Sequence, residues 1–126
     1  MLPPSRLEAG ALVILVALAL LASFVIARDR LTWLLEVVWV LLVLPWLLLA
    51  RVRTTRLLAW LLAAHALVLI EGGAYTYAQA PAGEWLRHVL GTQRNPWDRV
   101  GHLMQGIVPA VLAREVLLRR TPLRPG

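Results

Sequence analysis

Residues 9–27 read AGALVILVALALLASFVIA, a run of 19 residues without a charged side chain. At about 1.5 Å per residue, an α-helix of this length approaches the roughly 30 Å thickness of the hydrocarbon core of a bilayer. The run is longer than the roughly 7 to 15 apolar residues of a secretory signal peptide. A short polar sequence, ARDRLTW, then leads directly into another apolar run. The segment is therefore predicted to be a retained membrane helix.

Three further segments continue this pattern along the chain. Apolar runs are expected to span a membrane at about 31–50, 57–77 and 100–118, and a polar outer loop at 78–99 joins the last two. Hydrophobic residues make up 60% of the chain, and the mean hydropathy is +0.70, which is typical of membrane proteins rather than of soluble domains. The sequence predicts one all-α domain over residues 1–126, a polytopic membrane helical bundle with four transmembrane helices.

The composition also excludes several classes of function. The net charge is +6, but all 13 basic residues are arginines dispersed over the termini and loops, so no nucleic-acid partner is expected. The absence of cysteine excludes disulfides, thiolate chemistry and cysteine-bound metals. The sequence contains no phosphate-binding glycine loop, zinc-protease histidine pair or serine nucleophile elbow. We therefore expect no cofactor, although carboxylates and imidazole leave a divalent ion as a minor alternative.

The arginines indicate the orientation of the chain. If both termini are cytoplasmic, seven arginines lie on that side: Arg6, Arg51, Arg53, Arg56, Arg119, Arg120 and Arg124. Five lie outside: Arg28, Arg30, Arg87, Arg94 and Arg99. Because arginines close to helix ends favour the cytoplasmic side, both termini are predicted to be cytoplasmic. The partners expected are membrane lipids, a second copy of the chain or a partner membrane protein.

Four ionisable residues are predicted to lie at a similar depth below the outer face. Glu36 lies five residues into the second segment, and Glu71 lies six residues before the end of the third. At about 1.5 Å per residue, each is about 7 to 9 Å inside the membrane. Asp98 precedes the fourth segment as a possible N-cap, and His102 follows one helical turn later. Together they predict a polar pocket open to one side of the membrane.

The spacing rules add two side chains to this pocket and suggest roles. Tyr75 shares a helix face with Glu71, and Gln105 extends the stripe of Asp98 and His102 inward. Catalytic acid–base work is assigned to Asp98, His102 and Glu71. Ligand binding is assigned to Arg94, Arg99, Tyr75, Gln105 and Glu36, with the two arginines holding an anionic headgroup. The function predicted is the binding or processing of an envelope lipid or other amphiphile, and whether the chain is an enzyme stays open.

Three alternatives stand beside this prediction. The glutamates could pair with Arg30, Arg94 or Arg99 and only lock the loop. The chain could be a structural or partner-binding subunit, or a small proton- or ion-coupled transporter component. A transport path needs polar residues across the whole membrane, but the fourth segment is apolar between Gln105 and Arg114. This gap favours a pocket on one side of the membrane.

Several smaller expectations concern the surroundings of the pocket. His65 is expected to pack or to hydrogen-bond between helices, because it does not share a helix face with Glu71. The sequence QAPAGEW is expected to form a turn, and residues 84–90 are expected to form a short amphipathic surface helix. Arg114 and Glu115 are expected to form an ion pair or anchor at a helix end.

The sequences GGAYTYAQAPAGEWLR and RNPWDRVGHLMQGIVPAVLAREVLLR resemble, in this order, the YjdF-type family of bacterial inner-membrane proteins. The resemblance covers about residues 71–119. It implies a multi-pass inner-membrane protein, and it implies no established activity. Members of that family continue through further helices, which leaves open whether the natural chain continues past Gly126.

Overall fold

The computed structural model describes residues 2–76 and 79–123, which form five helices and no strand. The helices are α1 (Arg6–Ile26), α2 (Arg30–Leu49), α3 (Arg56–Tyr75), α4 (Pro81–Leu90) and α5 (Trp97–Arg120). The all-helical fold predicted from the sequence is confirmed.

Side-chain caps explain where the first three helices begin. Ser5 accepts a hydrogen bond from the backbone N–H of Glu8 at 3.0 Å, and Glu8 returns the contact in a capping box. Asp29 accepts from the backbone N–H of Leu31 at 3.1 Å and so caps α2. Thr55 does the same for α3. Each cap satisfies a backbone donor that has no partner within its helix.

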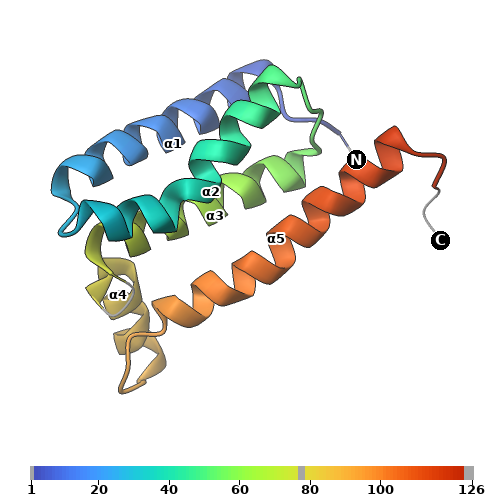
Figure 1. The fold of residues 1–126 in the computed structure, drawn as a ribbon. Helices are drawn as coiled ribbons and strands as arrows, with labels where there is room; N and C mark the ends of the chain where they lie inside the picture. Colours follow the sequence, from blue (N-terminus) through green and yellow to red (C-terminus); the bar gives the residue numbers. More distant parts are fainter. Residues whose placement is uncertain (1, 77–78, 124–126) are drawn as a thin grey trace.

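Helix α3 lies at the centre of the bundle and contacts α1, α2 and α5 (Figure 1). It runs parallel to α1 and antiparallel to α2 and α5. The start of α1 and the end of α5 therefore lie at one end of the bundle, which we call the termini end. The opposite end, where α4 lies, is the α4 end (Figure 1).

The packed residues follow helical periodicity. In α5 the buried positions are Gly101, Val108 and Glu115, which are seven residues apart and so lie on one face. This face packs on α3. Between α1 and α2, the buried Trp33 donates its indole N–H to Ser23 at 2.7 Å, which closes the helical hairpin.

Pro45 lies inside α2, at a position where proline interrupts the regular helical hydrogen bonds. Proline cannot donate the backbone hydrogen bond of its helical turn, and its ring clashes with the preceding turn. Figure 1 shows the second half of α2 turning away from the direction of its first half and away from α5. This bend separates α2 from α5 toward the termini end (Figure 1).

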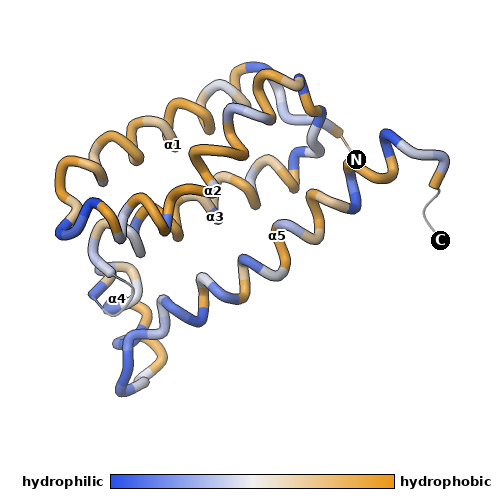
Figure 2. Tube along the Cα trace, viewed as in Figure 1, coloured by the Kyte–Doolittle hydropathy of each residue, from blue (hydrophilic) through white to orange (hydrophobic). Residues whose placement is uncertain are grey.

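Three helices of the described chain, α1, α2 and α3, are long and apolar enough to cross a membrane. Helix α5 has 24 residues and is long enough, but it carries more polar residues, as its paler and bluer trace shows (Figure 2). The prediction of four spans is therefore not confirmed. Helix α4 begins at Pro81, within the loop expected at 78–99. The turn expected at QAPAGEW (residues 79–85) is therefore wrong from Pro81 onward, because those residues are helical. A proline favours this position because the first turn of a helix does not use its N–H.

Candidate functional site

A polar cavity of about 150 Å³ opens at the α4 end. Its lining residues are Glu36, Asp98, Gly101, His102 and Gln105, and we call it the polar chamber. The last four lie on α5 at spacings of three and four residues, which place them along one helix face. Glu36 enters from α2. The structure thus brings together four of the residues that the sequence analysis selected.

Close contact between α2 and α3 positions Glu36. A side chain at Gly73 of α3 would place its Cβ 3.3 Å from the Cβ of Glu36 and 3.4 Å from Trp33. The glycine therefore lets the two backbones approach closely, as small residues do between membrane helices. Glu36 is half-buried, and the described residues donate no hydrogen bond to its carboxylate.

Asp98 and His102 form the second wall of the polar chamber. The Nε2 atom of His102 lies 3.2 Å from Oδ1 of Asp98, and both side chains are largely exposed. Asp98 is not the N-cap that we expected, because α5 begins at Trp97 and Pro96 occupies the capping position. As the second helical residue, Asp98 points along the face that leads to His102, one turn deeper.

Glu71 does not line the polar chamber, contrary to the prediction. Its Oε1 accepts a hydrogen bond of 2.7 Å from the backbone N–H of Ala82, the second residue of α4. Positions 71 and 73 differ by about 200° around α3, so the face of Gly73 that meets α2 is nearly opposite that of Glu71. Glu71 thus supplies the cap that α4 lacks within its own sequence, since Ala80 offers no capping side chain.

The other three predicted ligand contacts also lie outside both cavities described for this structure. Arg94 and Arg99 are exposed, and neither forms an ion pair with any residue in 2–76 or 79–123. Tyr75 is half-buried at the last position of α3. The ion pairs that would tie Glu36 or Glu71 to Arg30, Arg94 or Arg99 do not occur among these residues either.

Asn95 holds the junction of α4 and α5, and the sequence analysis did not select it. Its amide nitrogen donates to the carbonyl of Ala80 at 3.1 Å and to Glu84 at 3.3 Å, while its oxygen accepts from the N–H of Trp97 at 2.9 Å. A Cβ at Gly83 would lie 1.9 Å from that oxygen, so the junction requires glycine. An asparagine before a proline often begins a turn, which was the available signal.

The amphipathic character expected of residues 84–90 is present in α4. Trp85, Val89 and Leu90 are exposed, whereas Leu86 is half-buried.

At the same end of the bundle, the carboxylate of Asp29 accepts hydrogen bonds from other residues of the chain. Hydrogen bonds from the Thr32 hydroxyl and the Leu31 backbone lower the pKa of Asp29.

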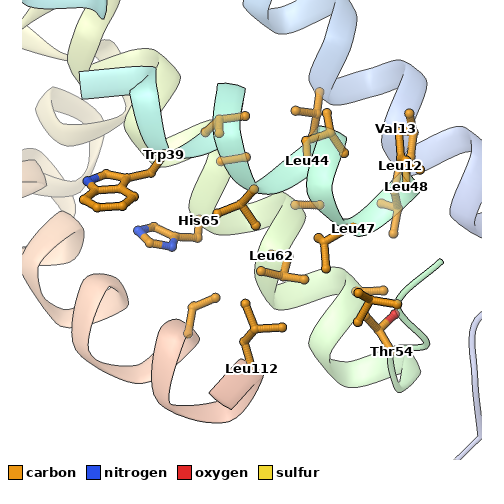
Figure 3. Close-up of a pocket in the computed structure, with 18 of the residues that line it drawn as sticks. Leu12, Val13, Trp39, Leu44, Leu47, Leu48, Thr54, Leu62, His65 and Leu112 are labelled. Carbon is orange, nitrogen blue, oxygen red and sulfur yellow. The ribbon is translucent and has the colours of Figure 1, made fainter. Parts of the chain in front are cut away.

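A larger cavity of about 680 Å³ lies between α2 and α5, with α3 as its floor and α1 along one side. Its lining is mainly apolar and includes Trp39, Leu44, Leu47, Leu62, Val108 and Leu112 (Figure 3). We call it the apolar chamber. Trp39, in the middle of α2, lines the chamber and is 61% exposed, so this part of the wall borders the outside of the bundle. From Leu69 to Ala59 along α3 it extends over ten residues, about 15 Å.

Gln105 lines both chambers, so they adjoin at this residue. Pro109 lies four residues later, also on the wall of the apolar chamber, and has no N–H to donate to the carbonyl of Gln105. The junction therefore offers a side-chain amide and a carbonyl oxygen without its usual helical donor.

His65 lines the wall of the apolar chamber. The hydrogen bond between helices, which was one of its two expected roles, is not formed by its Nε2 atom among the described residues. Its ring extends from α3 toward Trp39 (Figure 3). Its Nε2 atom is buried and has no hydrogen-bond partner in the described part of the chain.

The acids at the termini end have partners within the chain. Glu115 is buried and accepts hydrogen bonds from the backbone N–H of Thr55, at 3.1 Å, and from the Thr55 hydroxyl. Glu115 therefore anchors α5 to α3, as one of the two expected roles required. The other expected role, an ion pair with Arg114, is wrong, because Arg114 is exposed and Glu115 binds Thr55 instead. Among residues 2–76 and 79–123, no group of three acidic or histidine side chains is placed to hold a metal ion.

Comparison with known proteins identifies relatives. Residues 9–126 match a family model described as "Predicted membrane protein (DUF2238)". The inner membrane protein YjdF of Escherichia coli K12 is 46% identical over 121 residues, which cover 94% of this chain and 56% of that protein. The chain thus spans little more than half the length of this relative. The resemblance inferred from residues 71–119 is confirmed. No solved structure matches the chain.

Proposed function

Because this chain belongs to the DUF2238 family of predicted membrane proteins, we propose that it binds a membrane amphiphile in the two adjoining chambers. The polar head occupies the polar chamber, and one apolar chain occupies the apolar chamber. The observation that carries this proposal is the position of Gln105 on the wall of both cavities.

The dimensions and lining of the chambers suit such a ligand. The volume of the apolar chamber lies within the roughly 300 to 1,000 Å³ of typical small-molecule sites. Its length of about 15 Å equals half of the roughly 30 Å hydrocarbon core, the depth of one leaflet. The exposed part of the wall at Trp39 gives a route of entry from the bilayer.

The chemistry of the polar chamber favours a head that donates hydrogen bonds. Two carboxylates, those of Glu36 and Asp98, line it together with the Gln105 amide. Arg94 and Arg99 do not line it, so they are not the headgroup contacts in this proposal. In this proposal the Asp98–His102 pair exchanges a proton with the bound head, and the carboxylate, 3.2 Å from the imidazole, orients the ring. We place this chamber on the outer face, with both termini in the cytoplasm.

The proposal is tested by native mass spectrometry of the detergent-extracted protein with its co-purified lipids. Asp98→Asn and His102→Ala alter the polar chamber, and His88→Ala is the matched control, because His88 is exposed on α4 and lines neither cavity. Leu62→Trp fills the apolar chamber, and Ala64→Trp places the same side chain at an exposed position of α3.

We expect the native chain and both controls to retain a lipid, and the chamber variants to retain at least tenfold less. Equal lipid occupancy in all five variants and the native chain would reject the proposal. In that case the second candidate function, a partner-binding subunit, gains weight. It is favoured by the exposed Trp39 in the chamber wall and by the greater length of the relative, and it predicts a protein helix in the apolar chamber.

A further inference from the structure

The Nε2 atom of His65 is the polar atom of the apolar chamber that most needs explanation. It is buried, and the described residues offer it no hydrogen-bond partner. A buried polar atom without a partner destabilises the fold, so such atoms are normally satisfied by the protein, by water or by a ligand. Because the ring extends into the chamber toward Trp39 (Figure 3), a ligand in the chamber can reach it.

The level of His65 in the bundle defines which part of a ligand meets it. Gly73 contacts Glu36 at the polar chamber, and His65 lies eight residues (73 minus 65) further along α3, about 12 Å. The apolar chamber begins at Leu69, about 6 Å before His65, and continues to Ala59, about 9 Å beyond it. The ring of His65 extends back toward Trp39 (Figure 3), which lies three residues (39 minus 36), about 4.5 Å, beyond Glu36 along α2. Through its ring, His65 therefore faces the part of the ligand where head and apolar chain join.

We infer that the amphiphile is an acylated lipid, whose chain carbonyl accepts a hydrogen bond from Nε2 of His65. This inference depends on the proposed function. In an acyl lipid the carbonyl is the first group of the chain, so it lies next to the head and ahead of the methylenes. A neutral carbonyl also fits the surroundings, because Leu62 and Val108 line the same cavity and a charged group there would lose its hydration.

The inference separates two lipids that differ only in the group that His65 recognises. The probes are diacyl and dialkyl phosphatidylethanolamine of equal chain length, added in competition and counted by native mass spectrometry. The ester lipid carries the carbonyl, and the ether lipid replaces it with a methylene. We expect the native chain to prefer the ester lipid by about three- to tenfold, the ratio that corresponds to one net hydrogen bond.

Variants at position 65 test whether this preference arises at the histidine. His65→Leu removes the donor and should reduce the ester-to-ether ratio to about one, whereas His65→Asn retains a donor and should keep part of the preference. His88→Leu, on the exposed face of α4, should keep all of it. The ratio of bound ester lipid to bound ether lipid is informative even where a variant binds both lipids less well, because an equal loss of affinity for the two lipids leaves the ratio unchanged.

The outcomes distinguish this inference from the proposed function. Binding of both lipids by the native chain in equal amounts overturns the inference and leaves the amphiphile site standing, with water as the partner of His65. A preference that persists in His65→Leu also overturns the inference. Binding of neither lipid removes the proposed function itself.

Discussion

The two ends of the bundle treat their acidic side chains in different ways. At the termini end, Glu115 is 8% exposed and accepts both polar hydrogens of Thr55. Glu8 at the same end contacts Arg56 and Trp60. The carboxylates there join the starts of α1 and α3 and the end of α5, so their partners are other parts of the chain.

At the α4 end, one carboxylate binds another part of the chain, and two others face a cavity. Glu71 caps α4, whereas Glu36 and Asp98 line a cavity together with His102. Among the described residues, the carboxylate contact of the polar chamber is that of Asp98 with the imidazole of His102, one turn away on the same helix. The comparison teaches that an acid in a membrane-length helix indicates a site only where the fold leaves it facing open space.

The comparison is tested most strongly at Glu115. Glu115→Ala leaves the N–H and hydroxyl of Thr55 without their acceptor in a buried position, which should lower the free energy of unfolding by about 3 kcal/mol. Titration with sodium dodecyl sulfate, followed by tryptophan fluorescence, measures this change. The neighbouring exposed Arg114→Ala is the control and should change it little. Similar stability of the two variants would show that the termini end does not depend on this acid.

A smaller loss of stability is expected at the junction of α4 and α5. In Gly83→Ala the new methyl group would lie 1.9 Å from Oδ1 of Asn95 and 2.7 Å from Cβ of Trp97. Overpacking of this kind costs about 2 kcal/mol. The same titration measures it, and Gly91→Ala on the far side of α4 is not a suitable control because Gly91 has a φ of 69°. Gly10→Ala serves instead, because nothing lies within 4 Å of its Cβ position. A loss as large in Gly10→Ala would contradict the steric explanation.

The smallest loss of stability is expected at Glu71, which caps α4 and does not line the polar chamber. Glu71→Met removes the acceptor of the Ala82 N–H and should cost about 1 kcal/mol, the usual value of a helix cap. Glu71→Gln keeps an acceptor oxygen and should cost less. Neither variant should change the lipid count in native mass spectrometry. Loss of lipid in both variants, with stability intact, would show that Glu71 belongs to the ligand site.

Much of the polar chamber could be predicted, because its residues follow local rules. Asp98, His102 and Gln105 share a helix face by spacing alone, and Glu36 reaches their depth by counting residues from the helix start. Glu71 lies at the predicted depth but outside the chamber, because depth does not specify the direction in which a side chain points around its helix. That direction depended on the contact of Gly73 with α2, which no local pattern states.

The apolar chamber and the burial of Glu115 had weaker signals. Gly101, Val108 and Glu115 repeat every seven residues, and this repeat could have indicated that Glu115 faces α3. The chamber itself arises because α2 bends and leads away from α5, and the sequence shows only that Pro45 permits a bend (Figure 1). Its lining and its volume follow from the packing of four helices, α1, α2, α3 and α5.

The sequence by itself determined that this is a helical membrane protein, which helices are apolar, and which polar residues of α5 lie on one face. These properties follow from composition and from the 3.6-residue period, which act within one segment. Only the tertiary structure decided which acids cap another helix and which face a cavity. It also decided that His65 and Gln105 line the same cavity. Those outcomes depend on how helices rotate and approach one another, and that is set by contacts between residues far apart in the chain.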